Sequence, residues 1–258
     1  MRKRIALIIV LAIVIAIGAI IIYILRPTKE ASAPIKAVPL QINPTQTRNA
    51  SAGSNGQMEP TDTQNSIIAG TEQETADTTR DAIFFTIDQE NSTVSFTLNE
   101  VLRGVPTTVV GNTNQVAGEI AVDVGAPVKT MAGTILVNAR TLVTDNNFRN
   151  RAIQNEILKT GDYEYITFTP KMISGIPENP QIGEEMSLQI TGNLTIRDIS
   201  QEINFTATVT VTSETSMMGY ASTVVNRADF NLVIPEVPHV ANVDEQVLLE
   251  IHFFAEAK

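Results

Sequence analysis

The sequence contains no cysteine and no tryptophan, and only two histidines, His239 and His252. Without cysteine the chain has no disulfide framework, no Cys or Cys/His zinc site, no thiol catalysis and no lipid-modified cysteine. Two histidines cannot form a three-histidine metal site. Aromatic residues make up only 5% of the 258 residues, which argues against a stacking surface for single-stranded nucleic acid.

Basic residues are also scarce, with 18 Lys and Arg against 28 Asp and Glu and a formal net charge of −10. This acidic excess repels phosphate backbones, so no nucleic-acid partner is expected. The sequence has no hydrolase elbow, phosphate-binding loop, zinc-protease helix or EF-hand loop. A weak metal site at His239 with Asp244 and Glu245 is disfavoured against a solvated loop. We therefore expect no catalytic residue, no cofactor, no metal and no enzymatic activity.

Residues 5–25 form the one long apolar run, 21 residues without a charge, and three basic residues precede it. At 1.5 Å per residue this run spans a hydrocarbon core of roughly 30 Å. The positive-inside rule then places the N-terminus in the cytoplasm and the rest outside. A cleaved signal peptide, which would give a secreted protein, is the rival. The run is longer than a signal core, and the A-x-A-like triplet 31–33 lies well beyond it. Residues 1–25 are therefore predicted to be a membrane anchor.

Residues 26–80 are rich in Ser, Thr, Asn, Gln, Pro and Gly, and their apolar residues are isolated. Such a composition cannot bury a core, so we expect a disordered linker with a reach on the order of 40 Å. The remaining residues, 81–258, have the size of one domain. They carry ten basic and 22 acidic residues, a formal charge of −12.

Apolar and polar residues alternate through most of residues 81–258, which indicates half-buried antiparallel strands. The clearest alternating segments are 94–98, 119–124, 135–139, 166–172, 186–196, 203–211 and 247–253. About eight such segments, separated by Gly, Pro, Asn and Asp turns, predict an all-β sandwich or a closed barrel.

Residues 146–158 lack this alternation and begin with residues that can cap a helix. At 100° per residue, the apolar side chains from Phe148 to Ile157 form one broad arc. Arg149 falls inside the arc, whereas Arg151 points the other way. We expect a short helix that covers a sheet end or the mouth of a barrel.

Five segments, taken in order, resemble the successive signatures of the YceI-like family. They are FTIDQENSTVSF (85–96), TLVTDNNFRNRAIQNEILKTGDYEYITF (141–168), ITGNLTIRDISQEINF (190–205), NRADFNLVIPEV (226–237) and VDEQVLLEIHF (243–253). The resemblance implies a lipocalin-like closed antiparallel barrel of about eight strands whose mouth is covered by one short helix. It also implies that the barrel binds a polyisoprenoid.

A barrel of this size encloses one elongated ligand, and small inward residues leave room for it. The expected cavity lining is Phe96, Leu98, Val137, Ala139, Phe168, Ile190, Gly192, Leu194, Phe205, Ala207, Val209, Leu249 and Ile251. Arg149 and Arg227 are the candidates for the ligand head group or the mouth. Because the domain is strongly acidic, a neutral head group is favoured over a pyrophosphate.

Two functions of different class remain. In the first, a membrane-tethered extracytoplasmic domain holds an isoprenoid lipid or isoprenoid quinone for transport, storage or sequestration. In the second, a structural or adhesive all-β surface domain has no ligand, and its apolar faces simply pack together. A homodimer is left open as a further partner. The volume enclosed by the sheet separates the two functions.

Overall fold

The computed structural model describes residues 15, 18, 27–32, 34–40 and 82–258. The predicted anchor over residues 1–25, apart from positions 15 and 18, and the larger part of the predicted linker lie outside these residues. Within the described residues, no helix is both long enough and apolar enough to cross a membrane.

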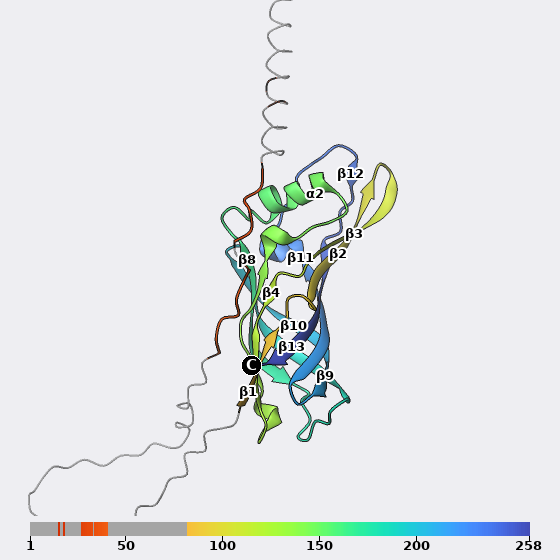
Figure 1. Cartoon of the computed structure of the whole chain (residues 1–258). Coiled ribbons are helices and arrows are strands. Elements are labelled where there is room, and N and C mark those ends of the chain that lie inside the picture. The colour runs from red at the N-terminus through yellow and green to blue at the C-terminus, as the bar shows by residue number, and fades with distance from the viewer. Residues whose placement is uncertain (1–14, 16–17, 19–26, 33, 41–81) are drawn as a thin grey trace, which may run out of the picture. The chain divides into compact units, whose positions relative to one another are not determined.

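Residues 82–258 form one antiparallel sheet that curls into a half-barrel (Figure 1). Its thirteen strands, counted over the described residues, are β1 (Ala82–Ile87), β2 (Thr93–Leu102), β3 (Val105–Thr113), β4 (Val116–Ala117), β5 (Glu119–Asp123), β6 (Met131–Ala132), β7 (Ile135–Asn138), β8 (Tyr165–Ser174), β9 (Glu185–Ile196), β10 (Ile199–Ser213), β11 (Ser216–Asn226), β12 (Val240–Ala241) and β13 (Gln246–Ala257). The predicted all-β architecture is confirmed, but the described residues form a half-barrel of thirteen strands where a closed barrel of about eight is expected.

The curl follows from the way that the strands share partners. Strand β13 pairs with β11 along one edge and with β2 and β1 along the other. Strands β3, β4 and β5 follow one another closely in the sequence. Strand β3 pairs with β2 and β5 pairs with β1, whereas β4, between them, pairs with β7. Near this junction Asn112 and Val143 exchange two backbone hydrogen bonds of 2.9 and 3.0 Å. The two flanks of the sheet are thereby drawn together around a concave face.

The predicted helix is confirmed as α2 (Asn147–Ala152), which continues into the π-helical turn η3 (Ile153–Ile157). The Asn146 side-chain oxygen caps it by accepting hydrogen bonds from the backbone N–H groups of Phe148 and Arg149, at 2.9 and 3.1 Å. We call the end of the half-barrel that carries α2 and β12 the helix end (Figure 1).

The helix end also holds the short turns η2 (Ala139–Thr141) and η4 (Arg227–Phe230), the β2–β3 turn and the β9–β10 turn. The opposite end holds η1 (Pro127–Lys129), the loop 175–184 and the turn 214–215. Beneath α2 and η3 lies a buried cluster, in which Phe230 is completely inaccessible to solvent.

Residues 27–32 and 34–40, which we call the docked segment, belong to the same compact unit as residues 82–258. At the helix end, Lys29 Nζ donates a hydrogen bond of 2.7 Å to the Gly161 carbonyl. Both the N–H and the hydroxyl of Ser32 donate to the Glu164 carboxylate, each at 2.7 Å. Lys29 and Ser32 thus fix the start of the segment to the loop that follows η3.

The docked segment continues away from the helix end. Ile35 is buried, and its carbonyl accepts a hydrogen bond of 2.6 Å from the Gln89 side chain. The Leu40 N–H donates to the Glu119 carboxylate at 2.9 Å, and the Leu40 side chain packs over Gly133. The sequence predicts a disordered linker over residues 26–80, and within it the structure describes these contacts for residues 27–32 and 34–40. Isolated apolar residues find individual sites on the domain even though they cannot form a core themselves.

Candidate ligand cavity

The concave face of the sheet encloses a cavity of about 600 Å³. Its wall is almost entirely apolar and draws on strands from all parts of the half-barrel as well as on α2 and η3. The polar and charged residues in the wall are Ser95, Glu100, Thr130, Asn146, Arg149, Arg227 and Glu250. A space of this size and character suits a small or elongated apolar ligand.

Most of the lining residues expected from the alternation border this cavity. They are Phe96, Leu98, Val137, Phe168, Ile190, Leu194, Phe205, Val209, Leu249 and Ile251, and Arg149 and Arg227 border it as well. Because side chains alternate across a pleated strand, one residue in two faces the cavity. The period of the sequence pattern therefore identifies the wall.

Three expected lining residues, Ala139, Gly192 and Ala207, are not among the residues that border the cavity. Ala139 lies in η2, after β7 has ended, and is buried in the cluster beneath the helix. Gly192 is covered by the Phe168 ring, whose Cζ lies 2.8 Å from the position of a Cβ on the glycine. Ala207 is only 1% exposed, between its cross-strand partners Leu188 and Ala221. The space beside these small residues is therefore filled by neighbouring side chains and is not available to a ligand.

Two further glycines are covered by phenylalanine in the same way. Gly111 on β3 lies opposite Phe96 on β2, and Gly219 on β11 lies opposite Phe253 on β13. In each pair the ring occupies the place that a Cβ on the glycine would need. The nearest ring atom lies 2.2 Å from that position for Phe96 and 2.6 Å for Phe253. These rings lie along the sheet and cover the neighbouring strand, so the centre of the cavity stays open.

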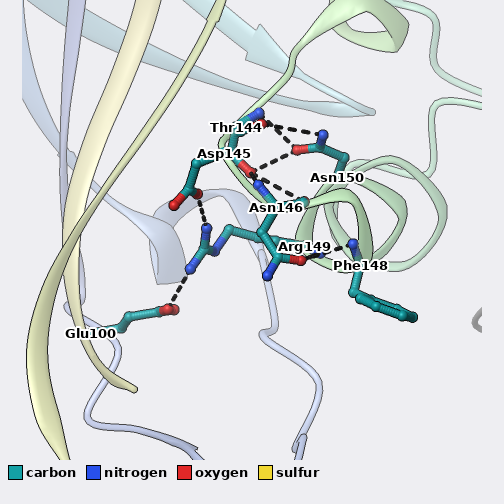
Figure 2. Close-up of polar contacts among 7 residues, drawn as sticks. All are labelled: Glu100, Thr144, Asp145, Asn146, Phe148, Arg149 and Asn150. Atoms are coloured by element: carbon teal, nitrogen blue, oxygen red, sulfur yellow. Dashed lines mark hydrogen bonds and ion pairs between the residues drawn. The ribbon is translucent and has the colours of Figure 1, made fainter. Parts of the chain in front are cut away.

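Arg149 forms the charged part of the wall at the helix end. Its guanidinium donates to Glu100 Oε1 at 2.7 Å and to Asp145 Oδ1 at 2.5 Å, as Figure 2 shows. Glu100 is 7% exposed, whereas Asp145 is largely solvated. The Phe148 side chain points away from this ion pair (Figure 2). Arg149 is thus held inside the apolar arc of the helix, as the helical phase predicts, and is paired by two carboxylates.

Arg227 is also occupied by the protein itself. Its guanidinium donates to the backbone carbonyls of Asp244, Leu232 and Val243 at 2.7, 3.2 and 3.4 Å. It also pairs with the Glu245 carboxylate at 3.0 Å. These bonds connect η4 to the loop before β13, so the main role of this side chain is to hold the rim of the helix end.

The two histidines lie outside the cavity wall. His252 is exposed on β13, and its ring packs against Tyr220 with centroids 4.7 Å apart. His239 is exposed in the loop before β12, where its carbonyl accepts a hydrogen bond from the Arg103 N–H. No cluster of three or more His, Cys, Asp or Glu that could hold a metal occurs among the described residues.

The expected lining leaves out several parts of the wall, the longest of which is the irregular segment between η4 and β13. Its lining residues are Leu232, Ile234, Pro235, Val237, Pro238, Val240 and Val243. Prolines interrupt the period-two pattern there, so the segment does not read as a strand. The available signal was the density of apolar residues in a loop, because loops on a domain surface are ordinarily polar.

A curled antiparallel sheet, one short helix at its end and an apolar interior define the class of the lipocalin-like fold. The model of the YceI-like domain matches residues 85–255. The chain therefore belongs to the YceI-like family. This match covers the half-barrel and excludes the docked segment.

Three solved structures are similar to the chain. A polyisoprenoid binding domain from Saccharophagus degradans implicated in plant cell wall breakdown has 16% identity, with coverage of 67% of this chain and 98% of that one and a TM-score of 0.55. For BcnA from Burkholderia cenocepacia these values are 18%, 65%, 98% and 0.49. For the YCEI protein of Campylobacter jejuni they are 20%, 57%, 84% and 0.45. No curated protein matches the chain.

Proposed function

We propose that this protein is a membrane-tethered, extracytoplasmic lipid-binding protein that holds an isoprenoid chain, from a polyprenyl lipid or an isoprenoid quinone, inside its half-barrel. The observation that carries the proposal is the apolar cavity of about 600 Å³. In this proposal the curled sheet surrounds the bound isoprenoid chain as a closed barrel would. The name of the Saccharophagus degradans relative, a polyisoprenoid binding domain, supports the same ligand class.

Burial of hydrocarbon supplies the binding energy. Each Å² of apolar surface removed from water contributes about 25 cal/mol, before the cost of ordering the ligand. A long isoprenoid exposes much apolar surface and few polar groups, and the wall offers the same composition. Such binding needs no nucleophile and no general base, and the role is to carry, store or sequester the lipid.

The head group in this proposal is neutral, an alcohol or a quinone ring. Arg149 and Arg227, the two cations in the wall, are already paired with Glu100, Asp145 and Glu245. A pyrophosphate would have to compete with these carboxylates in a domain of net charge −12. Affinity for a polyprenyl alcohol independent of salt supports the neutral head group, whereas tighter, salt-sensitive binding of the pyrophosphate contradicts it.

Tethering rests on residues 5–25, whose uncharged run follows three basic residues and has the length of a membrane span. With this anchor the N-terminus lies in the cytoplasm and residues 82–258 lie outside, next to the bilayer that contains the lipid. Full-length protein that stays in the membrane fraction after a wash at high pH supports the anchor. Protein that is released, or that has lost residues 1–25, contradicts it.

The test of lipid binding uses two neighbouring leucines on β13. Leu249 borders the cavity, and Leu248 faces the other side of the sheet. Full-length protein carrying Leu249→Trp or Leu248→Trp is purified in detergent, and its organic extract is analysed by mass spectrometry. We expect an isoprenoid lipid with the native chain and with Leu248→Trp, and its loss with Leu249→Trp.

The Leu248→Trp control separates lipid in the cavity from lipid that surrounds an anchor helix. Equal lipid in all three samples would mean that the cavity is not its site. A clean extract from every sample, with no uptake of added polyprenol or quinone, would favour the structural or adhesive domain instead.

A further inference from the structure

The docked segment begins very close to the predicted anchor. Lys29 is bonded to Gly161 at the helix end, and the apolar run ends at position 25. Four residues span at most about 14 Å even when fully extended. If the run crosses a bilayer, the helix end must therefore lie at the bilayer surface.

The chain order strengthens this constraint. The docked segment leads from Lys29 at the helix end to Leu40, and Leu40 contacts Glu119 on β5. Strand β1, which follows residues 41–81, also pairs with β5. Residues 41–81 thus join two points that lie along the same strand of the domain. The length of this part of the chain does not set the distance between the domain and the membrane.

The helix end presents large apolar side chains to solvent. Val105 in the β2–β3 hairpin, Phe148 on α2 and Val233 in the loop after η4 are 62%, 67% and 74% exposed. They come from three separate elements that meet at this end (Figure 1). Exposed apolar side chains on a hairpin, a short helix and a loop suit the boundary between lipid head groups and acyl chains.

Basic residues are concentrated at the helix end. Seven of the ten basic residues in 82–258 lie at the helix end, namely Arg103, Arg140, Arg149, Arg151, Lys159, Arg197 and Arg227. Arg103, Arg151 and Lys159 are exposed. The opposite end also exposes apolar residues, Val128 and Ile182, but its loops carry Glu178, Glu184 and Glu214. The helix end also exposes carboxylates, among them Asp145, Asp162, Asp198, Asp229, Glu236 and Glu245, so it is not basic overall. It nevertheless offers three exposed cations to anionic head groups, whereas the loops of the opposite end carry only the exposed Lys129 beside their glutamates.

We propose that the helix end rests on the bilayer that holds the protein's own anchor, and that the docked segment fixes this orientation. Val105, Phe148 and Val233 enter the interface. The proposal rests on the anchoring given above as part of the function, and it deepens that function by defining the route of the lipid. The cavity wall reaches the helix end through Phe148 and Leu232, so an isoprenoid chain passes between bilayer and cavity without crossing bulk water.

The absence of cysteine allows a direct test with single labels. Full-length Val105→Cys and Val233→Cys variants, labelled with an environment-sensitive fluorophore, are reconstituted in phosphatidylethanolamine and phosphatidylglycerol vesicles that contain nitroxide-bearing lipid. Val128→Cys and Ile182→Cys are matched controls, because their parent side chains are 52% and 58% exposed at the opposite end. We expect the nitroxide lipid to quench the labels at 105 and 233 and to leave those at 128 and 182 bright.

Quenching at the opposite end, at both ends equally or at neither end overturns the proposed orientation. The role of the docked segment is tested in a Glu164→Gln, Ser32→Ala background, which removes the hydroxyl bond of Ser32 and leaves its N–H only an uncharged acceptor. There we expect the difference in quenching between the two ends to shrink, and an unchanged difference refutes that role.

Lipid content, measured separately by mass spectrometry, keeps the two proposals apart. Bound isoprenoid without quenching at the helix end would refute the proposed orientation and support the carrier function. Quenching at the helix end in a protein whose extract contains no isoprenoid would refute the carrier function and support the proposed orientation.

Discussion

Phe96 and Gly111 face each other across β2 and β3, and a Cβ placed on Gly111 would lie 2.2 Å from Cε1 of the phenylalanine ring. The ring therefore lies over the glycine and not across the cavity. The absence of a single methyl group on one strand sets the position of an aromatic ring on the next. The volume of the cavity depends on this pairing.

The Gly111→Ala variant should bind less lipid at nearly unchanged stability. The atoms that clash belong to the end of a side chain, so the Phe96 ring can turn away, and the space open to it is the cavity. Lipid content by mass spectrometry and melting temperature are measured together. Gly125→Ala is the control, because its nearest neighbour would be a side-chain oxygen of Asp123 at 3.6 Å. Native lipid content in Gly111→Ala would contradict the proposed role of the ring.

Gly192→Ala, unlike Gly111→Ala, should lower the free energy of unfolding. A Cβ at Gly192 would lie 2.5 Å from the Thr169 carbonyl oxygen and 2.8 Å from the Pro170 Cα. These backbone atoms cannot rotate away, so β8 and β9 must separate, at a cost of roughly 1–3 kcal/mol. Chemical denaturation measures this change. A variant as stable as the native chain would show that the strands adjust freely.

Ala207→Trp is also expected to destabilise the domain. Ala207 is 1% exposed between Leu188 and Ala221, so an indole has no free volume to enter. Overpacking of this kind costs roughly 1–3 kcal/mol or more. Leu249→Trp, which points into the cavity, is the comparison and should retain more of the native melting temperature. The reverse order would place the free space at Ala207.

The alternation of apolar residues was sufficient to predict an all-β sheet and most of its long strands, though not β11, and ten of the thirteen expected lining residues border the cavity. It could not show that Gly192 lies beneath Phe168, because that contact joins two strands whose register no single-strand pattern contains. Strand β3 escaped prediction for another reason. Its segment, VPTTVVGNT, includes a proline and a glycine, both unfavourable within strands. The docked segment depends on individual contacts with residues more than fifty positions away, so its composition alone indicated a coil.

Removal of the Arg149 side chain should destabilise the helix end. In Arg149→Met, Glu100 would be left buried without its cation, a loss of about 3 kcal/mol when a buried pair is broken. The double variant Glu100→Leu, Arg149→Met should recover much of this loss, because no unpaired charge remains. A double-mutant cycle by chemical denaturation measures the coupling. Additive losses would mean that the two residues act independently.

Acid should release the docked segment. Burial acts to raise the pKa of Glu164, but hydrogen bonds from Ser32 and Asn138, together with the charge of Arg140, outweigh it and hold the pKa below its ordinary value of 4.5. A group with a lowered pKa contributes stability above its ordinary pKa and loses it as the pH falls through the lowered value. Docking should therefore be complete at neutral pH and weaken progressively below about pH 4.5.

Hydrogen exchange of the Ser32 amide, corrected for its intrinsic dependence on pH, measures this release. Glu164→Gln keeps the size of the side chain and removes the carboxylate, so the protection of Ser32 should be weaker and should respond less to acid. Protection that stays constant as Glu164 becomes protonated would show that other contacts hold the segment.

Strand β13 has a consequence for the order in which the molecule forms. Its residues Leu248–His252 pair with β2, and Ala255–Ala257 pair with β1, partners that precede it by more than 150 positions. No local hairpin can replace these pairings, and the entropy of closing so long a loop opposes each of them. Folding dominated by such distant contacts takes milliseconds to seconds, slower than in helical domains of similar size. Until β13 is in place, β1 and β2 expose unpaired edges, and this interval is when the chain is most prone to aggregate.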